Sequence, residues 1–198
     1  MGKIIIREEK SMTRNDNHFK DLIKAAESGN DVAQAHLGWK YKQGDASAQN
    51  SLGWMNYTGE GDSAPNYDEA KYWYEKAAEQ NDINAQNNLG RLYHDGSGFS
   101  APNYIMAKFW YEKAATRGHL NAQFNLGLIY QEGEGLEAAD YEKARYWYEK
   151  AAEQNDPLAR FNLGWLYFTG KGLAAPDYEK AKFWYEKAPE HFSQQIAE

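Results

Sequence analysis

Apolar residues along this chain recur in two helical patterns that alternate with each other. The pattern over residues 67–79 predicts an amphipathic helix, because its apolar residues fall within an arc of roughly 140° when each residue advances by about 100°. These residues are Tyr67, Ala70, Trp73, Tyr74, Ala77 and Ala78. The second pattern, from Ala85 to about Asp95, ends at a Gly-x-Gly turn. No segment shows sustained alternation with a period of two, so the sequence predicts helices and no strands.

The two patterns belong to a repeat of 37 residues. Three copies follow one another without a gap, at residues 66–102, 103–139 and 140–176. A partial copy begins at residue 177, and residues 46–65 are the second half of an earlier copy. The second helix of each pair is expected to begin after an N-cap residue. The four candidates are Asn66, Asn103, Asp140 and Asp177.

A single pair of such helices cannot bury its own apolar side, but stacked pairs can cover one another. The chain is therefore expected to be all-α, a solenoid of about ten helices arranged in antiparallel hairpins. Glycines just beyond the first helix of each pair fit this prediction, because glycine adopts the left-handed conformation that ends a helix. They are Gly59, Gly96, Gly133 and Gly170.

The strings AQNNLGRLYHDGSG and DYEKARYWYEKAAEQN resemble Sel1-like repeats, a branch of the tetratricopeptide-type solenoids. This resemblance implies a right-handed superhelix of hairpins that serves as an adaptor or scaffold. It covers four repeats, at residues 46–82, 83–119, 120–156 and 157–192. We expect a disordered or tag-like segment at residues 1–16, a capping helix pair at 17–45 and a tail at 193–198.

Positions that stay constant between the copies are explained by packing. In the first helix these include a mid-helix glycine, which costs about 1 kcal/mol relative to alanine and so predicts close contact with a neighbouring helix. The glycines are Gly53, Gly90, Gly127 and Gly164. The tryptophan of the second helix is also constant and is expected to belong to the core, at Trp73, Trp110, Trp147 and Trp184.

Positions that vary between the copies lie on the other side of the first helix, which by the resemblance lines a concave surface. Clusters of Trp, Phe and Arg are common at interface hot spots, so these positions are the candidate partner-binding residues. They are Trp54, Tyr57, Asn87, Arg91, His94, Phe124, Leu128, Phe161, Trp165 and Phe168. Two alternatives stay open: the rings fill space between repeats, or the tail covers them.

The net charge is −7, from 29 acidic and 22 basic residues. This balance argues against nucleic acid and anionic lipid as partners, since both require clustered basic residues. No apolar run approaches the ~20 residues that span a bilayer, and no secretory signal peptide is evident. We therefore expect a cytoplasmic protein whose partner is a protein or peptide, although a removed export signal stays open. Its oligomeric state is not predicted.

An enzymatic alternative arises because some relatives have been named as β-lactamases or β-lactam binders. The sequence has no cysteine, and no serine is followed three residues later by lysine. None of the five histidines lies four residues from another, the spacing of a zinc-binding helix. We therefore expect neither catalysis nor a cofactor nor a metal. The alternative function is that of a small-molecule binder or hydrolase that acts on β-lactam or cell-wall ligands. A third hypothesis is a narrower form of the adaptor function, in which the partner is a bacterial toxin or effector that the protein neutralises or regulates.

Overall fold

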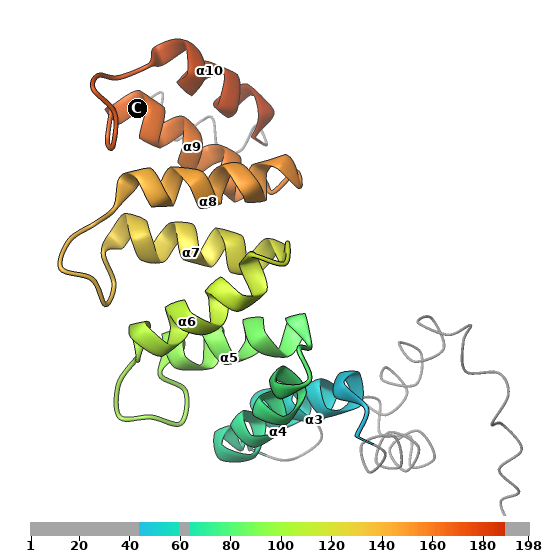
Figure 1. Ribbon diagram of the computed structural model, residues 1–198. Helices are drawn as coiled ribbons and strands as arrows, with labels where there is room; N and C mark the ends of the chain where they lie inside the picture. Colours follow the sequence, from blue (N-terminus) through green and yellow to red (C-terminus); the bar gives the residue numbers. More distant parts are fainter. Residues whose placement is uncertain (1–43, 60–63, 189–198) are drawn as a thin grey trace, which may run out of the picture.

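The computed structural model describes residues 44–59 and 64–188. In these two ranges all regular secondary structure is α-helical. Figure 1 shows the helices following one another in chain order along a column. Their bounds are α3 Ala46–Thr58, α4 Tyr67–Glu79, α5 Ile83–Asp95, α6 Tyr104–Ala115, α7 Leu120–Glu132, α8 Tyr141–Glu153, α9 Pro157–Thr169 and α10 Tyr178–Lys187.

Each helix begins and ends where local chemistry favours it. The side chain of Asn66 accepts a hydrogen bond from the backbone N–H of Glu69 at 3.2 Å, and α6, α8 and α10 begin in the same way. At the other end, Gly96 adopts a left-handed conformation with φ of 69°, as do the glycines that follow α3, α7 and α9. The predicted N-caps and terminating glycines are thus confirmed.

The helices form four consecutive antiparallel hairpins, α3–α4, α5–α6, α7–α8 and α9–α10, and the second helix of each packs against the first helix of the next. One continuous core runs through the stack. In α4 it contains Ala70, Tyr74 and Ala77, and in α5 it contains Leu89 and Leu92, all of them fully buried. The predicted right-handed α-solenoid of stacked hairpins is confirmed, because each hairpin buries its apolar side only against its neighbours.

The constant glycines allow a tyrosine ring to lie directly against a helix backbone. A Cβ atom added at Gly127 would lie 2.4 Å from ring carbons of Tyr148, closer than any real contact. The same arrangement joins Gly53 to Tyr74, Gly90 to Tyr111 and Gly164 to Tyr185. The expectation that a neighbouring helix touches these glycines is confirmed, and the neighbour is the second helix of the same hairpin.

The tyrosine, and not the adjacent tryptophan, is the buried ring of α4, α6 and α8. Tyr74, Tyr111 and Tyr148 are at most 1% exposed, whereas the constant tryptophans are only half-buried. The prediction that the tryptophans belong to the core holds only in part, because Trp110, Trp147 and Trp184 pack against the core but are not enclosed in it. One residue advances about 100° around a helix, which places the tryptophan at the edge of the buried arc beside the fully enclosed tyrosine.

One N-cap differs from its counterparts and makes stability depend on pH. His119 accepts a hydrogen bond from the Ala122 N–H through Nδ1 at 3.3 Å, whereas Asp45, Asp82 and Asp156 cap the equivalent helices. Burial lowers the pKa of His119 below its ordinary value of about 6.5. Between the lowered pKa of His119 in the folded protein and its ordinary pKa in the unfolded chain, the unfolded chain binds more protons. The contribution of this N-cap to stability is therefore complete above the unfolded-state pKa and is lost as the pH falls toward the folded-state pKa.

We expect His119→Asp to raise the free energy of unfolding by about 1 kcal/mol at pH 5. An aspartate carboxylate caps the helix N-terminus well, whereas the helix dipole disfavours the protonated imidazole there. Urea unfolding of both proteins from pH 7 to pH 5 measures the effect. The wild-type free energy of unfolding should fall more steeply with acidity than that of the variant. Parallel pH profiles would show that His119 does not contribute to the slope.

The described residues include no helix long and apolar enough to cross a membrane. The predicted N-terminal segment at 1–16, most of the predicted capping pair at 17–45 and the predicted tail at 193–198 lie outside the described residues.

Candidate partner-binding face

The candidate residues all lie on the first helices of the hairpins, namely α3, α5, α7 and α9. We call the surface formed by the varying positions of these helices the first-helix face. Asn87 is only 8% exposed and so contributes almost no surface, whereas the other nine candidates keep part of their side chains accessible. The structure thus places nine of the ten predicted residues at the surface of this face, to different extents.

Arg91 on α5 lies over two aromatic side chains of α3. Its guanidinium carbon lies 4.7 Å from the ring centroid of Trp54 and 4.5 Å from that of Tyr57, and these two rings stack on each other. Contacts of this kind are favourable by about 0.5–2 kcal/mol, depending on how far the cation is desolvated. Three separately predicted residues therefore form one cation–aromatic cluster that joins the first two hairpins.

The Arg91 cluster encloses polar atoms that lack partners. Nε and Nη2 of Arg91, the hydroxyl of Tyr74 and Oδ1 of Asn87 are buried without a hydrogen bond among the described residues. Burial raises the pKa of Tyr74, and the nearby Arg91 charge partly opposes this shift. Arg91 also has no ion pair in the described part of the chain. Its position is therefore fixed by aromatic packing and not by a carboxylate.

His94 links α5 to the turn that follows α7. Its Nδ1 lies 3.2 Å from Asp95 Oδ1, and its Nε2 lies 3.0 Å from Glu134 Oε2. The Tyr57 hydroxyl also donates to Asp95, at 3.2 Å, so the network reaches α3. Sequence analysis missed Glu134 because it occupies a turn between two glycines, where helical periodicity gives no information on direction.

The C-terminal half of the face is apolar and only partly packed. Phe124 lies 5.8 Å from the buried Tyr148 ring, between centroids, and Phe161 lies 5.6 Å from Tyr185. These inner rings extend the core outward, and Leu128 also packs against it. The interpretation that the rings fill space therefore describes part of the face.

The helix α9 carries the most accessible apolar stripe. Phe168 is 46% exposed and Leu158 is 41% exposed, at opposite ends of the helix. Phe161 and Trp165 lie between them, and the spacing of three, four and three residues places all four on one side. The other side of α9 is buried, through Ala159, Leu163 and Leu166. Leu158 varies between the copies but was not among the ten candidates.

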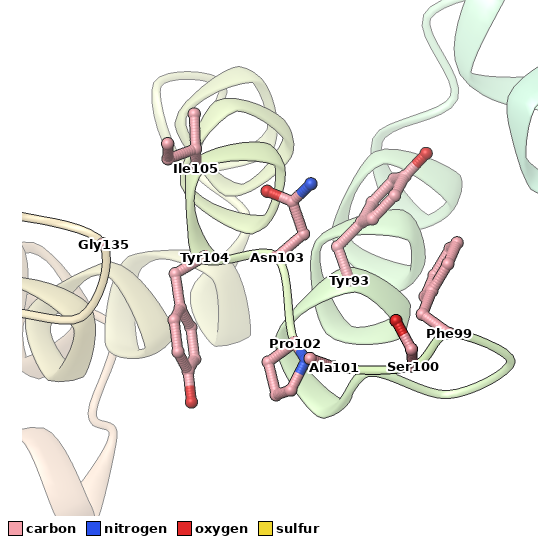
Figure 2. A pocket seen from close by; sticks show the side chains of 9 residues that line it. All are labelled: Tyr93, Phe99, Ser100, Ala101, Pro102, Asn103, Tyr104, Ile105 and Gly135. Carbon is pink, nitrogen blue, oxygen red and sulfur yellow. The ribbon is translucent and has the colours of Figure 1, made fainter.

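A separate pocket of about 460 Å³ lies beside the loop that joins α5 to α6 (Figure 2). None of the ten candidate residues lines it. Its walls contain no carboxylate, imidazole, amine or guanidinium group, so they offer aromatic and neutral polar contacts only. The lining residues are Tyr93, Phe99, Ser100, Ala101, Pro102, Asn103, Tyr104, Ile105 and Gly135.

The stacked hairpins and the variable first-helix face define a helical repeat protein of the solenoid class. The sequence model of the Sel1 repeat matches residues 46–82, 83–119, 120–156 and 157–188, and the chain belongs to this family. Sel1 repeats generally mediate protein interactions. A search of curated protein sequences finds no match to this chain.

Two solved bacterial structures show the same fold. The chain is 31% identical to c5321, a protective antigen of uropathogenic Escherichia coli, with a TM-score of 0.77 over 87% of this chain. It is 32% identical to a Sel1 repeat protein from Oxalobacter formigenes, with a TM-score of 0.75 over 91% of this chain. The matched region spans 38% of the first relative's chain and 69% of the second's.

Proposed function

We propose that this chain is a non-catalytic adaptor that binds a protein or an extended peptide on its first-helix face, which forms the concave side of the superhelix. Membership of the Sel1 repeat family supports the general role of an interaction scaffold. The position of the binding surface rests on the structure of this chain alone.

The observation that carries the proposal is the apolar stripe on α9. Its side chains Leu158 and Phe168 stay 41% and 46% exposed, although the opposite side of the same helix is fully packed. The equivalent positions of α5 are Asn84 and His94, both polar, so the fold itself does not require apolar residues there. A partner that covers this stripe would bury surface that now contacts water.

The polar half of the face would supply specificity. Arg91 is fixed by two rings, and His94 is fixed by Asp95 and Glu134, so these groups lose little conformational entropy when a partner docks. Aromatic and arginine side chains in rigid positions are typical of residues that dominate binding energy. We therefore place affinity on α9 and α7, and selectivity on α5.

The proposal predicts that Trp165→Ala combined with Phe168→Ala weakens partner binding by about 100-fold or more. Each ring is expected to contribute hot-spot energy of about 2 kcal/mol, although such terms are not additive. Tagged wild-type and variant proteins capture partners from extracts of the native organism, and the captured protein is then purified and titrated by calorimetry. Circular dichroism checks that the variant keeps its helical content.

Phe183→Ala on α10 is the matched control, because Phe183 is also 46% exposed but lies on a second helix. The proposal requires this control to bind the same partner as tightly as the wild type. Equal binding by the α9 variant, or loss of binding by the α10 control alone, would place the docking surface elsewhere.

A further inference from the structure

The second helices present an exposed aromatic ring once in every repeat. These rings are 43–51% exposed, yet all four copies keep Tyr or Phe there. Each one contacts the next tryptophan edge-on, with centroids 4.6–5.1 Å apart. We call this surface the second-helix face; its rings are Tyr72, Phe109, Tyr146 and Phe183. Nearly half of each ring is still in water, so core packing does not account fully for this position.

Charges flank the rings in a fixed order. Four residues before the ring, three of the copies carry an acid, namely Asp68, Glu142 and Glu179. Four residues after it, every copy carries a lysine, and the four are Lys76, Lys113, Lys150 and Lys187. Along α4, α8 and α10 the surface therefore reads acid, ring, lysine. Turning such a helix end to end places its lysine opposite the acid of an identical helix, so the pattern is complementary to its own antiparallel copy.

The helix α6 departs from this order in an informative way. Ile105 occupies the position of the acid and is 67% exposed, the largest exposure among the large apolar residues described. Figure 2 shows Ile105 pointing away from Tyr104 at the start of α6. The other second helices carry acids in their first turn, which the helix dipole favours. Helix formation therefore does not explain an isoleucine here.

We propose that the second-helix face is the contact surface of a homodimer with its two-fold axis at α6. At such an axis α6 meets α6 of the partner in antiparallel orientation, and Ile105 of each copy packs beside Phe109 of the other. The flanking helix α4 then faces α8 of the second copy, where the lysines and acids alternate in register. An apolar centre with a charged rim is the usual anatomy of an interface, and a two-fold contact requires this self-complementarity.

The available area fits a modest dimer. Each half-exposed ring on α4, α6 and α8 offers roughly 100 Å², and Ile105 offers a similar amount. Together they supply roughly half of the ~800 Å² per partner found in a stable interface. The methylene groups of the lysines beside the rings supply further apolar surface. The amines of Lys76 and Lys113 lie 5.8 Å and 4.6 Å from the ring centroids of Tyr72 and Phe109.

The first test replaces Ile105 with lysine, which the antiparallel register places opposite Lys113 of the second copy. Sedimentation equilibrium across about a hundredfold range of concentration measures the mass, which we expect to rise toward twice the 22.7 kDa of one chain in the wild type. The dimer dissociation constant of Ile105→Lys should increase by roughly tenfold or more, because an apolar contact is replaced by two lysines that face each other, and this occurs twice at the axis. A monomeric wild-type protein at every concentration would overturn the proposal.

The second test examines the antiparallel register. Lys76→Glu should weaken the dimer, because it places two acids together where α4 faces Glu142 of α8. Adding Glu142→Lys restores opposite charges at both symmetry-related contacts and should recover the wild-type dissociation constant. If the wild type dimerises but the double variant stays as weak as Lys76→Glu, the proposed register is wrong.

Phe168→Glu on the first-helix face is the control that separates this inference from the proposed function. It should abolish partner binding and leave the dimer mass unchanged. Ile105→Lys should do the reverse. A loss of dimerisation in Phe168→Glu with none in Ile105→Lys would assign self-association to the first-helix face and refute the second-helix interface.

Discussion

Replacing Gly127 with alanine is expected to lower the free energy of unfolding by about 1–2 kcal/mol, although alanine forms helices better than glycine. The intrinsic gain is about 1 kcal/mol. Against it, the new methyl group would lie 2.4 Å from both Cδ1 and Cε1 of Tyr148, a fully buried ring that has no space to retreat. Overpacking of this kind usually costs 1–3 kcal/mol and sometimes more, and here it also pushes α7 away from α8.

Urea unfolding monitored by circular dichroism measures this change. Asn121→Ala is the matched control, because Asn121 lies on the same helix α7 but is exposed. The control should be neutral or slightly stabilising, since it gains helix propensity without a new contact. A Gly127→Ala protein as stable as the control would show that the ring and the backbone are not in the tight contact described.

The second large effect is expected for Tyr148→Ala, which should lower the free energy of unfolding by about 3–5 kcal/mol. This substitution removes a fully buried ring and leaves a cavity between α7 and α8. It also removes the hydrogen bond from the Tyr148 hydroxyl to Gln131 Oε1, which is 3.2 Å long. Burial raises the pKa of this hydroxyl, so the group stays neutral in the folded protein. Phe124, whose ring lies beside it, should become more mobile.

A double substitution tests whether the two effects have one cause. In the Tyr148→Ala background the ring is absent, so Gly127→Ala no longer creates a clash and only its helix propensity remains. The same change that destabilises the wild type should therefore stabilise the Tyr148→Ala protein by about 1 kcal/mol. Additive losses would mean that Gly127 is constrained by something other than this ring.

The two faces of the solenoid differ in how far their residues vary from one repeat to the next. On the first-helix face the copies differ, and Arg91, His94 and Phe168 each occur only once at their positions. On the second-helix face the ring and the lysine recur in all four copies. A unique surface suits one specific partner, whereas a periodic surface suits another periodic surface. This contrast is why we propose a heterologous partner for the first face and a second copy of the chain for the other.

Helix periodicity, N-cap residues and terminating glycines were sufficient to predict the helices, the hairpins and the stacked fold. These signals are local, since capping and helix termination act within a few residues of the chain. The constant glycines even predicted a close helix contact, which the Gly90–Tyr111 pair now shows. Nine of ten candidate residues also reach the surface, because a varying position on an amphipathic helix usually lies outside the core.

Only the tertiary structure decided which ring each hairpin buries and which side chains meet across hairpins. Tyr111 and Trp110 are neighbours on an aromatic arc, and their burial depends on where the glycine of the facing helix lies. Arg91 contacts Trp54 and Tyr57, and His94 contacts Glu134, across separations of 34 to 40 residues. These separations are close to one repeat, which brings neighbouring hairpins together but does not determine which of their side chains meet. The sequence specifies local geometry through short-range sterics and hydrogen bonds, whereas these contacts depend on how one hairpin is rotated against the next.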